Sequence, residues 1–178
     1  KVLRGAVSTP LKIGQEHLFL EAFRQLPLED SLQENLEEMH AFCMQQAMKY
    51  TEEQTRQAMQ SLIHNLNTMH SRAGAQVPFS SINYGTDTSP EGRMVIRNLL
   101  ESTIDGLGAG ETPIFPVQIF KVKEGVNYNP GDPNYDLFQL AIATSAKRLF
   151  PNFSFIDAPF NLAYYKEGDP NTEVAYMG

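Results

Sequence analysis

Apolar residues recur at helical spacing through the first 70 residues, in two stripes that each follow a helix-capping sequence. The first stripe follows Ser-Leu-Gln-Glu at 31–34, and the second follows Thr-Glu-Glu-Gln at 51–54. The stripes consist of Leu32, Leu36, Met39, Cys43 and Ala47, and of Ala58, Leu62, Leu66 and Met69. Two capped amphipathic helices in succession predict an antiparallel helical hairpin over residues 31–70, within a mainly helical segment 1–74.

Runs with strand composition alternate with helical patterns after residue 74. The expected strands are 76–84, 114–122 and 153–156, and the expected helices are 90–104 and 132–148. Pro90 suits a first helical position, and Gly106 and Pro151 lie just past the expected helix ends. Because this alternation is the order of βαβ units, segment 75–178 is predicted to form a parallel sheet. The fold class is therefore α/β, a helical hairpin followed by βαβαβ.

Charge and cysteine content narrow the possible functions. The net charge of −7 argues against a non-specific nucleic-acid binder, which needs a basic face. No apolar run approaches the roughly 20 residues of a membrane-spanning helix, and the first residues show no signal-peptide pattern. We therefore expect a cytoplasmic protein without membrane contact. Cys43, the one cysteine, excludes a disulfide framework or multi-cysteine zinc site within the chain, and its place in an apolar stripe predicts a buried core residue.

Seven acidic residues lie between positions 29 and 53, against one basic residue, Lys49. They are Glu29, Asp30, Glu34, Glu37, Glu38, Glu52 and Glu53. One interpretation is a solvated helix face, and the other is an interface with a basic partner. In the second case the hairpin forms a dimer contact or holds an effector nucleotide.

Four polar side chains fall within the first expected strand, in a segment that should be largely buried. These candidate substrate-binding residues are Gln76, Ser80, Ser81 and Asn83. Buried polar groups need partners, so these side chains either satisfy neighbouring backbone groups or bind a polar ligand. Strand alternation places Ser81 and Asn83 on one face and Ser80 on the other, which favours Ser81 and Asn83 as the ligand-facing pair. Ligand sites in parallel sheets also gather at the carboxyl ends of strands.

Other motifs do not support a cofactor or metal site. The glycine-rich segment 106–110 follows a helix and precedes a strand, the reverse of a dinucleotide-binding loop. Asp132, Asn134 and Asp136 have calcium-loop spacing, but Leu137 stands where that loop requires glycine, so a helix cap is the better interpretation. No metal site is expected in this chain.

Several ordered segments resemble the catalytic chain of anaerobic (class III) ribonucleoside-triphosphate reductases. They are residues 65–79 (Asn-Leu-Asn-Thr-Met-His-Ser-Arg-Ala-Gly-Ala-Gln-Val-Pro-Phe), 106–108, 112–116, 131–137 (Gly-Asp-Pro-Asn-Tyr-Asp-Leu), 139–141, 145–148 and the terminal Tyr176-Met177-Gly178. The resemblance covers roughly residues 55–178, and residues 1–10 are similar to a further family segment.

The resemblance implies a ten-stranded α/β barrel of the glycyl radical enzymes, of which this chain is a part. It implies reduction of ribonucleoside triphosphates to deoxyribonucleoside triphosphates, with formate as reductant. A glycyl radical, installed by a radical-SAM activase, and a structural zinc are both expected outside this chain. The family also implies dNTP or ATP effectors and a homodimer.

Two terminal residues gain a role from the same resemblance. In the family, a Met-Gly pair directly precedes the cysteine that becomes a thiyl radical and takes the ribose 3′ hydrogen. Met177 and Gly178 are therefore expected beside the catalytic cysteine, and this fragment alone is expected to be inactive. The alternatives are a non-catalytic dimerisation or effector-binding module of α/β type, and an unrelated α/β binding protein.

Overall fold

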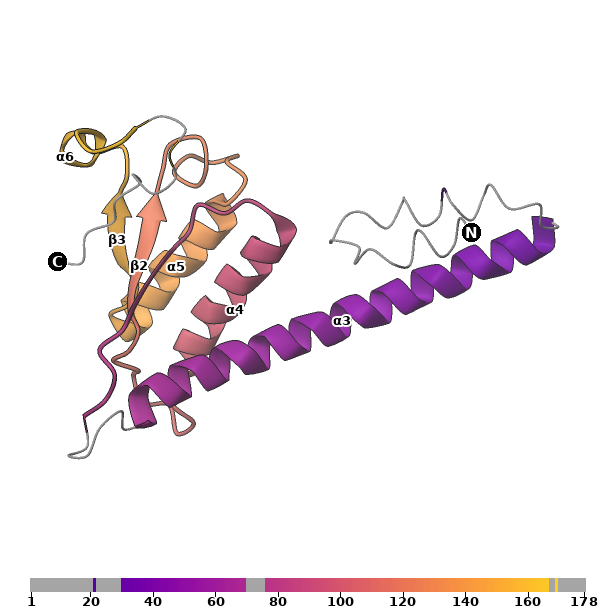
Figure 1. Ribbon diagram of the computed structural model, residues 1–178, viewed down its shortest axis with the longest axis horizontal. Coiled ribbons are helices and arrows are strands. Elements are labelled where there is room, and N and C mark those ends of the chain that lie inside the picture. Colours follow the sequence, from indigo (N-terminus) through magenta and orange to yellow (C-terminus); the bar gives the residue numbers. More distant parts are fainter. Residues whose placement is uncertain (1–20, 22–29, 70–75, 167–168, 170–178) are drawn as a thin grey trace. The chain divides into compact units, whose positions relative to one another are not determined.

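The computed structural model describes residues 21, 30–69, 76–166 and 169. The chain forms two compact units, Lys1–Gln54 and Thr55–Gly178. Helix α3 (Asp30–Thr68) begins in the first unit and ends in the second, which also contains strands β1 to β3 (Figure 1). The predicted boundary between residues 74 and 75 falls outside the described ranges and stays a prediction.

The predicted helical hairpin over residues 31–70 is wrong, because the single helix α3 runs through its intended turn. No glycine or proline occurs between residues 30 and 69, so no residue forces the helix to end. The hydroxyl of Thr51, the expected second N-cap, donates to the carbonyl of Ala47 at 2.7 Å. This is a bond that threonine makes inside a helix rather than at its start.

The first apolar stripe of α3 is not a buried face. Met39, Cys43 and Ala47 are all exposed, so the prediction of a core position for Cys43 is wrong. Helical spacing identifies which residues share a face, but burial needs a second surface that the spacing does not specify. In the second unit, by contrast, Ile63 of α3 is buried and Met59 packs beside it against the core.

Three parallel strands form the sheet, in the order β1 (Ser81–Tyr84), β2 (Val117–Val122) and β3 (Asn152–Phe155). Ser81 pairs with Val117, and Ile119 pairs with Asn152. Helices α4 (Pro90–Asp105) and α5 (Tyr135–Arg148) connect the strands, and the short α6 (Pro159–Leu162) follows β3. The βαβαβ order and the parallel sheet predicted from the sequence are confirmed, and the ten-stranded barrel stays a prediction.

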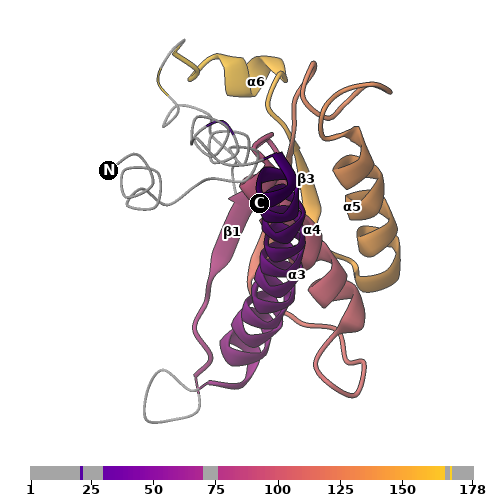
Figure 2. The same cartoon turned by 90° about the vertical axis from the view of Figure 1, so that its right-hand side faces the viewer.

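Helices α4 and α5 lie side by side along one face of the sheet (Figure 2). The hydrophobic core is made by buried residues of these two helices, of the sheet and of α3. They are Ile63, Tyr84, Ile96, Leu99, Leu100, Phe120, Val122, Leu137 and Ala141. Phe120 of the central strand is completely buried and contacts the rings of Tyr84, Phe138 and Phe153. The alternation of strand side chains therefore assigns the even-numbered residues of β1 and β2 to the helix-covered face.

Helix α4 begins as its sequence predicts. The Ser89 hydroxyl accepts a hydrogen bond from the Gly92 N–H at 3.1 Å, and Pro90 occupies the first turn. Its end at Asp105 is followed by Gly106 at φ +80°, a conformation that favours glycine. None of the helices within the described residues is both long and apolar enough to cross a membrane.

Asn67, near the end of α3, fastens that helix to the segment that leads into β2. Its amide nitrogen donates to the Ile63 carbonyl at 2.7 Å and to the Phe115 carbonyl at 2.6 Å. Its amide oxygen accepts from the N–H groups of Ile114 and Phe115 at 2.8 and 3.0 Å. Strand β2 therefore begins at Val117, later than the expected residue 114, because the preceding backbone is bonded to Asn67 rather than to β1.

Candidate functional site

The face of the sheet opposite α4 and α5 carries polar side chains around two apolar residues of the central strand, Val117 and the buried Ile119. On the covered face, Gln118 donates to the Thr103 hydroxyl of α4 at 2.8 Å and accepts from the Tyr84 hydroxyl at 2.6 Å. Because neighbouring strand residues point to opposite faces, Ser81 and Asn83 of β1 lie on the opposite face, together with Lys121 of β2. Register adds Asn152 and Ser154 of β3 to this polar face.

Ser81 and Asn83 share one face, as alternation predicted, but they are exposed rather than buried. The expectation of burial for this strand is therefore wrong, because α4 and α5 cover only its other face. Within the described ranges, neither side chain has a hydrogen-bond partner. Their polar groups are thus not used to satisfy neighbouring backbone, which leaves them available to a ligand.

The other two candidates lie before β1. Ser80 is half-buried, and its hydroxyl donates to the Pro78 carbonyl at 3.4 Å, a long bond. Gln76 is exposed and lies outside β1, which starts later than the expected strand 76–84. The structure therefore brings Ser81 and Asn83 together and does not bring Ser80 or Gln76 to the same face.

At the carboxyl end of β1, the chain turns away at Gly85 in a conformation that only glycine adopts easily. Its φ is +121°, and a Cβ atom there would lie 2.8 Å from the Lys121 carbonyl oxygen. The Gly85 carbonyl accepts two side-chain amides, from Asn127 at 3.0 Å and from Asn134 at 3.1 Å. The end of β1 is therefore fixed against the connection between β2 and α5.

Asparagine, arginine and aspartate side chains join this connection to the two helices. Asn134 also donates to the Asp87 carbonyl at 2.8 Å and accepts from the Arg93 guanidinium at 2.7 Å. Arg93 of α4 donates to the Pro133 carbonyl and pairs with Asp136 of α5 at 2.8 Å. Although Asn134 stands at the N-cap position of α5, its side chain makes no cap bond.

Two carboxyl groups at this edge have lowered pKa values. Hydrogen bonds from the Ser89 side chain and backbone lower the pKa of Asp87. For Asp136, desolvation raises the pKa, but hydrogen bonding and charge from Arg93 outweigh it, aided by Leu137 and Arg97, so its pKa is lowered overall. Both carboxylates are thus held in the ionised form.

Acid is expected to weaken the link between α4 and α5. Because the pKa of Asp136 is lower in the folded state, its contribution to stability is present above its unfolded pKa and is lost as pH falls through the folded value. Its side chain is 52% exposed, so the contribution is at most about 1 kcal/mol. Urea midpoints at pH 7 and pH 3 should therefore differ less in Asp136→Asn than in the unchanged chain.

Glu124→Gln is the matched control for this prediction. Glu124 is exposed and forms no ion pair with any residue that the structure describes. Its replacement should leave the loss of stability at pH 3 unchanged. An identical acid response in Asp136→Asn and the unchanged chain would contradict the role given to the Arg93–Asp136 pair.

A small hollow of about 200 Å³ lies beside the carboxyl ends of β2 and β3. It is lined by Val122, Glu124, Tyr128, Phe155, Asp157 and Ala158. The Glu124 N–H donates to the Asp157 carboxylate at 2.7 Å, which holds the two strand ends together. Two carboxylates around an apolar floor disfavour a phosphate group, so this hollow suits uncharged or positively charged groups rather than the triphosphate of a nucleotide.

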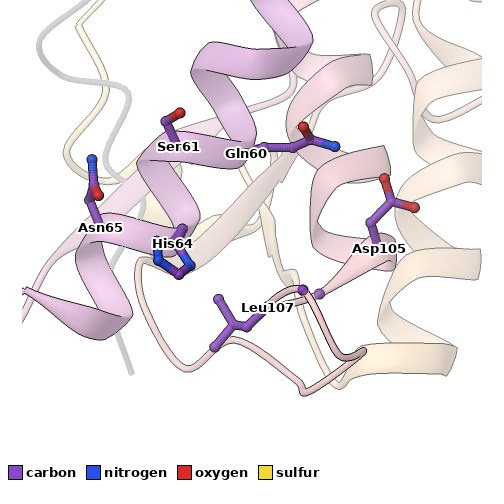
Figure 3. A pocket seen from close by; sticks show the side chains of 8 residues that line it. Gln60, Ser61, His64, Asn65, Asp105 and Leu107 are labelled. Carbon is purple, nitrogen blue, oxygen red and sulfur yellow. The ribbon is translucent and has the colours of Figure 1, made fainter.

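A larger opening of about 460 Å³ lies at the other end of the strands, where α4 ends and the chain leads into β2 (Figure 3). Gln60 and His64 of α3 lie on one side of it, and Asp105 and Leu107 lie on the other. Asp105 is paired with Arg56 at 3.0 Å. Because sites in parallel sheets form at the carboxyl ends of strands, this opening is not the predicted site.

Some predicted features are not placed by the structure. Met177 and Gly178 lie outside the described residues. Among the residues that are described, no group of three or more His, Cys, Asp or Glu side chains could hold a metal ion.

Sequence reasoning missed the roles of Asn67, Asn127 and Asn134. The sequence predicts a helix cap at Asn134, but it gives no sign that Asn127 and Asn134 both bond to the Gly85 carbonyl. Asn127 and Asn134 lie in a connection rich in Asn, Gly, Asp and Pro, whereas Asn67 lies in the last turn of α3. Such composition indicates side chains that bond to backbone, but not to which backbone.

Comparison with known proteins supplies the family. The family profile described as anaerobic ribonucleoside-triphosphate reductase matches residues 30–178. The anaerobic ribonucleoside-triphosphate reductase of Haemophilus influenzae is 43% identical over 96 residues, which are 53% of this chain and 13% of that protein. The enzymes of the same name from Escherichia coli and from Enterobacteria phage T4 are 41% identical over 96 residues and 42% identical over 107 residues.

The chain matches only a part of each relative. Its aligned segment spans 53% of this chain and 13% of the Escherichia coli protein, and 60% of this chain and 18% of the phage protein. The profile match covers all of α3 and the sheet with its covering helices. The chain belongs to the anaerobic ribonucleoside-triphosphate reductase family.

Proposed function

We propose that this chain is part of an enzyme that reduces ribonucleoside triphosphates to deoxyribonucleoside triphosphates, and that its sheet forms one wall of the substrate site. The observation that carries the proposal is the family match over residues 30–178. The parallel βαβαβ arrangement agrees with a segment of a larger α/β barrel. Because the chain spans a small part of its relatives, activity is a property of the intact enzyme.

The polar face of the sheet supports a role in binding substrate. Ser81 and Asn83 offer hydroxyl and amide groups that no described part of the chain uses. A hydroxyl both donates and accepts, and an amide does the same through separate atoms, which suits ribose hydroxyls or phosphate oxygens. Asn83 lies one residue before the carboxyl end of β1, which agrees with where ligands bind in parallel sheets, and Ser81 lies on the same face at the start of the strand.

The proposed chemistry uses groups outside this chain. A glycyl radical supplies a thiyl radical on a cysteine, which takes the ribose 3′ hydrogen, and formate is the reductant. Met177 offers an apolar thioether with no exchangeable proton beside that cysteine. Gly178, with no side chain, allows the backbone to approach the substrate closely. Gln76 is retained as an outer residue that orients the ligand-facing pair, whereas Ser80, whose hydroxyl donates to the Pro78 carbonyl, is left out of the ligand-facing set.

The remaining parts of the proposal concern partners. We include a radical-SAM activase, dNTP or ATP effectors, a structural zinc held elsewhere in the enzyme, and assembly as a homodimer. Exposed Met39, Phe42 and Tyr50 on α3 favour a protein contact there, although not one built from a helical hairpin. The alternative of a non-catalytic dimerisation or effector-binding module rests on this same helix.

Asn83→Ala in the intact enzyme is expected to raise the KM for ribonucleoside triphosphate by up to about tenfold, because one hydrogen bond to the substrate is lost. Ser81→Ala should act in the same direction. Initial rates under anaerobic conditions give both kinetic constants. The matched control is Ser80→Ala, which removes the same hydroxyl from the other side of the strand and should leave KM unchanged.

Two results would separate the parts of this proposal. Equal KM values for Asn83→Ala, Ser81→Ala and the unchanged enzyme would remove the sheet face from the substrate site. An intact enzyme that does not convert ribonucleoside triphosphates at all, with its activase and formate present, would contradict the proposed reaction.

A further inference from the structure

Two asparagines of the connection between β2 and α5 have no role in the function proposed above. Asn127 and Asn134 are completely buried, and a buried amide costs free energy unless its donors and acceptor are paired. Asn127 donates to the carbonyls of Gly85 and Lys121 and accepts from the Lys123 N–H. Each of the two side chains thus makes two donor bonds and one acceptor bond.

Their shared target is the carbonyl of Gly85, two residues after Asn83. Asn134 reaches past Gly85 to a second carbonyl, that of Asp87. The segment 85–87 is consequently held at two points by side chains from a part of the sequence more than 40 residues away. The pairing of β1 with β2 holds the backbone of Asn83 in the sheet. The side-chain amides of Asn127 and Asn134 hold residues 85–87, which follow it.

The amide of Asn134 is itself oriented by α4. Its oxygen accepts from Arg93, whose guanidinium also pairs with Asp136 of α5. The backbone N–H of Asn134 donates to the Val126 carbonyl at 2.9 Å, so the two ends of the β2–α5 connection are hydrogen-bonded to each other. The β1–α4 connection, the first turns of two helices and the β2–α5 connection therefore form one hydrogen-bonded unit at the carboxyl edge of the sheet.

We propose that Asn127 and Asn134 are positioning residues of the nucleotide site, which act by holding Gly85 and Asp87 and so fix the place of Asn83. They do not touch the substrate. The inference rests on the proposed function, in which Asn83 binds the ribonucleoside triphosphate. Such support matters because a displacement of about 1 Å in a binding group can cost roughly 100-fold in rate.

The test compares Asn134→Ala with Asn67→Ala in the intact reductase. Asn67 is a matched control because its amide also bonds to backbone on both sides, but near the start of β2 rather than at its carboxyl end. Both variants should lose stability and are assayed at a temperature where both remain folded. Asn134→Ala should raise the KM for ribonucleoside triphosphate by about tenfold or more, whereas Asn67→Ala should not change it.

Two further measurements distinguish a local change at residues 85–87 from a general loss of stability. Amide hydrogen exchange at residues 85–87 should accelerate in Asn134→Ala and stay unchanged in Asn67→Ala. Asn134→Asp preserves size and the contact with Arg93 but loses both donor bonds, so it serves if the alanine variant does not fold. Combined with Asn83→Ala, either Asn134 variant should show less than the product of the two separate KM effects.

Equal KM changes in the Asn134 and Asn67 variants would overturn the inference, as would independent effects of Asn134 and Asn83. An unchanged rate of exchange at residues 85–87 would overturn it as well. An unmutated enzyme that fails to convert ribonucleoside triphosphates overturns the proposed function and this inference with it. The unmutated enzyme is assayed first, so this outcome is distinguished from a failure of the inference about Asn134 alone.

Discussion

Replacing Phe120 by alanine is expected to lower the free energy of unfolding of the Thr55–Gly178 unit by about 3–5 kcal/mol, the usual range for a buried phenylalanine. Phe120 is completely buried in the central strand. Its ring centroid lies 5.6 Å from that of Tyr84, 6.1 Å from Phe138 and 6.0 Å from Phe153. A cavity at this point removes contacts from both outer strands and from α5 at once.

Urea unfolding of the 178-residue chain, followed by the fluorescence of its tyrosines, measures this loss. The matched control is Phe160→Ala, because Phe160 of α6 is 67% exposed and contributes little to the core. The control should change the free energy of unfolding by less than about 0.5 kcal/mol. A loss below about 1 kcal/mol in Phe120→Ala would contradict the central place given to this ring.

Replacing Asn67 by alanine should cost about 2–3 kcal/mol, because each buried polar group that loses its partner costs about 1–3 kcal/mol. The change removes two donor bonds and two acceptor bonds. The N–H of Phe115 and its carbonyl then both lose their side-chain partner. Alanine is the better helix former, which offsets the loss by roughly half a kcal/mol.

Hydrogen exchange along β2 and a urea titration measure the consequence of this substitution. Asn65→Ala is the matched control, since Asn65 is an exposed asparagine two residues earlier on the same helix. It should be neutral or slightly stabilising. Similar effects of the two substitutions would show that Asn67 acts through helix propensity and not through its bonds to residues 114 and 115.

Local sequence signals predicted the α/β half of the chain closely. The expected helix 90–104 is observed at Pro90–Asp105, because Ser89, Pro90 and Gly106 each fix the local backbone. The order and parallel pairing of the strands followed from the alternation alone. By contrast, the capping sequence at Thr51 did not start a helix, because a threonine hydroxyl bonds equally well to the preceding turn.

The candidate site was predicted in part. Alternation placed Ser81 and Asn83 on one face, since that relation is a property of a single strand. Their exposure was missed, because it depends on which face the helices cover. The bonds of Asn67 to Phe115 and of Asn134 to Gly85 join residues 48 and 49 positions apart. Spacing within one element carries no information about such partners.

The parallel pairing of the sheet has a consequence for how the chain folds. Ser81 pairs with Val117, 36 residues later (117 − 81), and Ile119 pairs with Asn152, 33 residues later (152 − 119). Each pairing must close a loop of this length before it gains any ladder bond, and such non-local contacts make folding slow. The helices α4 and α5 involve only neighbouring residues and can form within microseconds. During synthesis, β1 therefore emerges from the ribosome before β2 does, and its edge stays unpaired for the seconds needed to add another 36 residues.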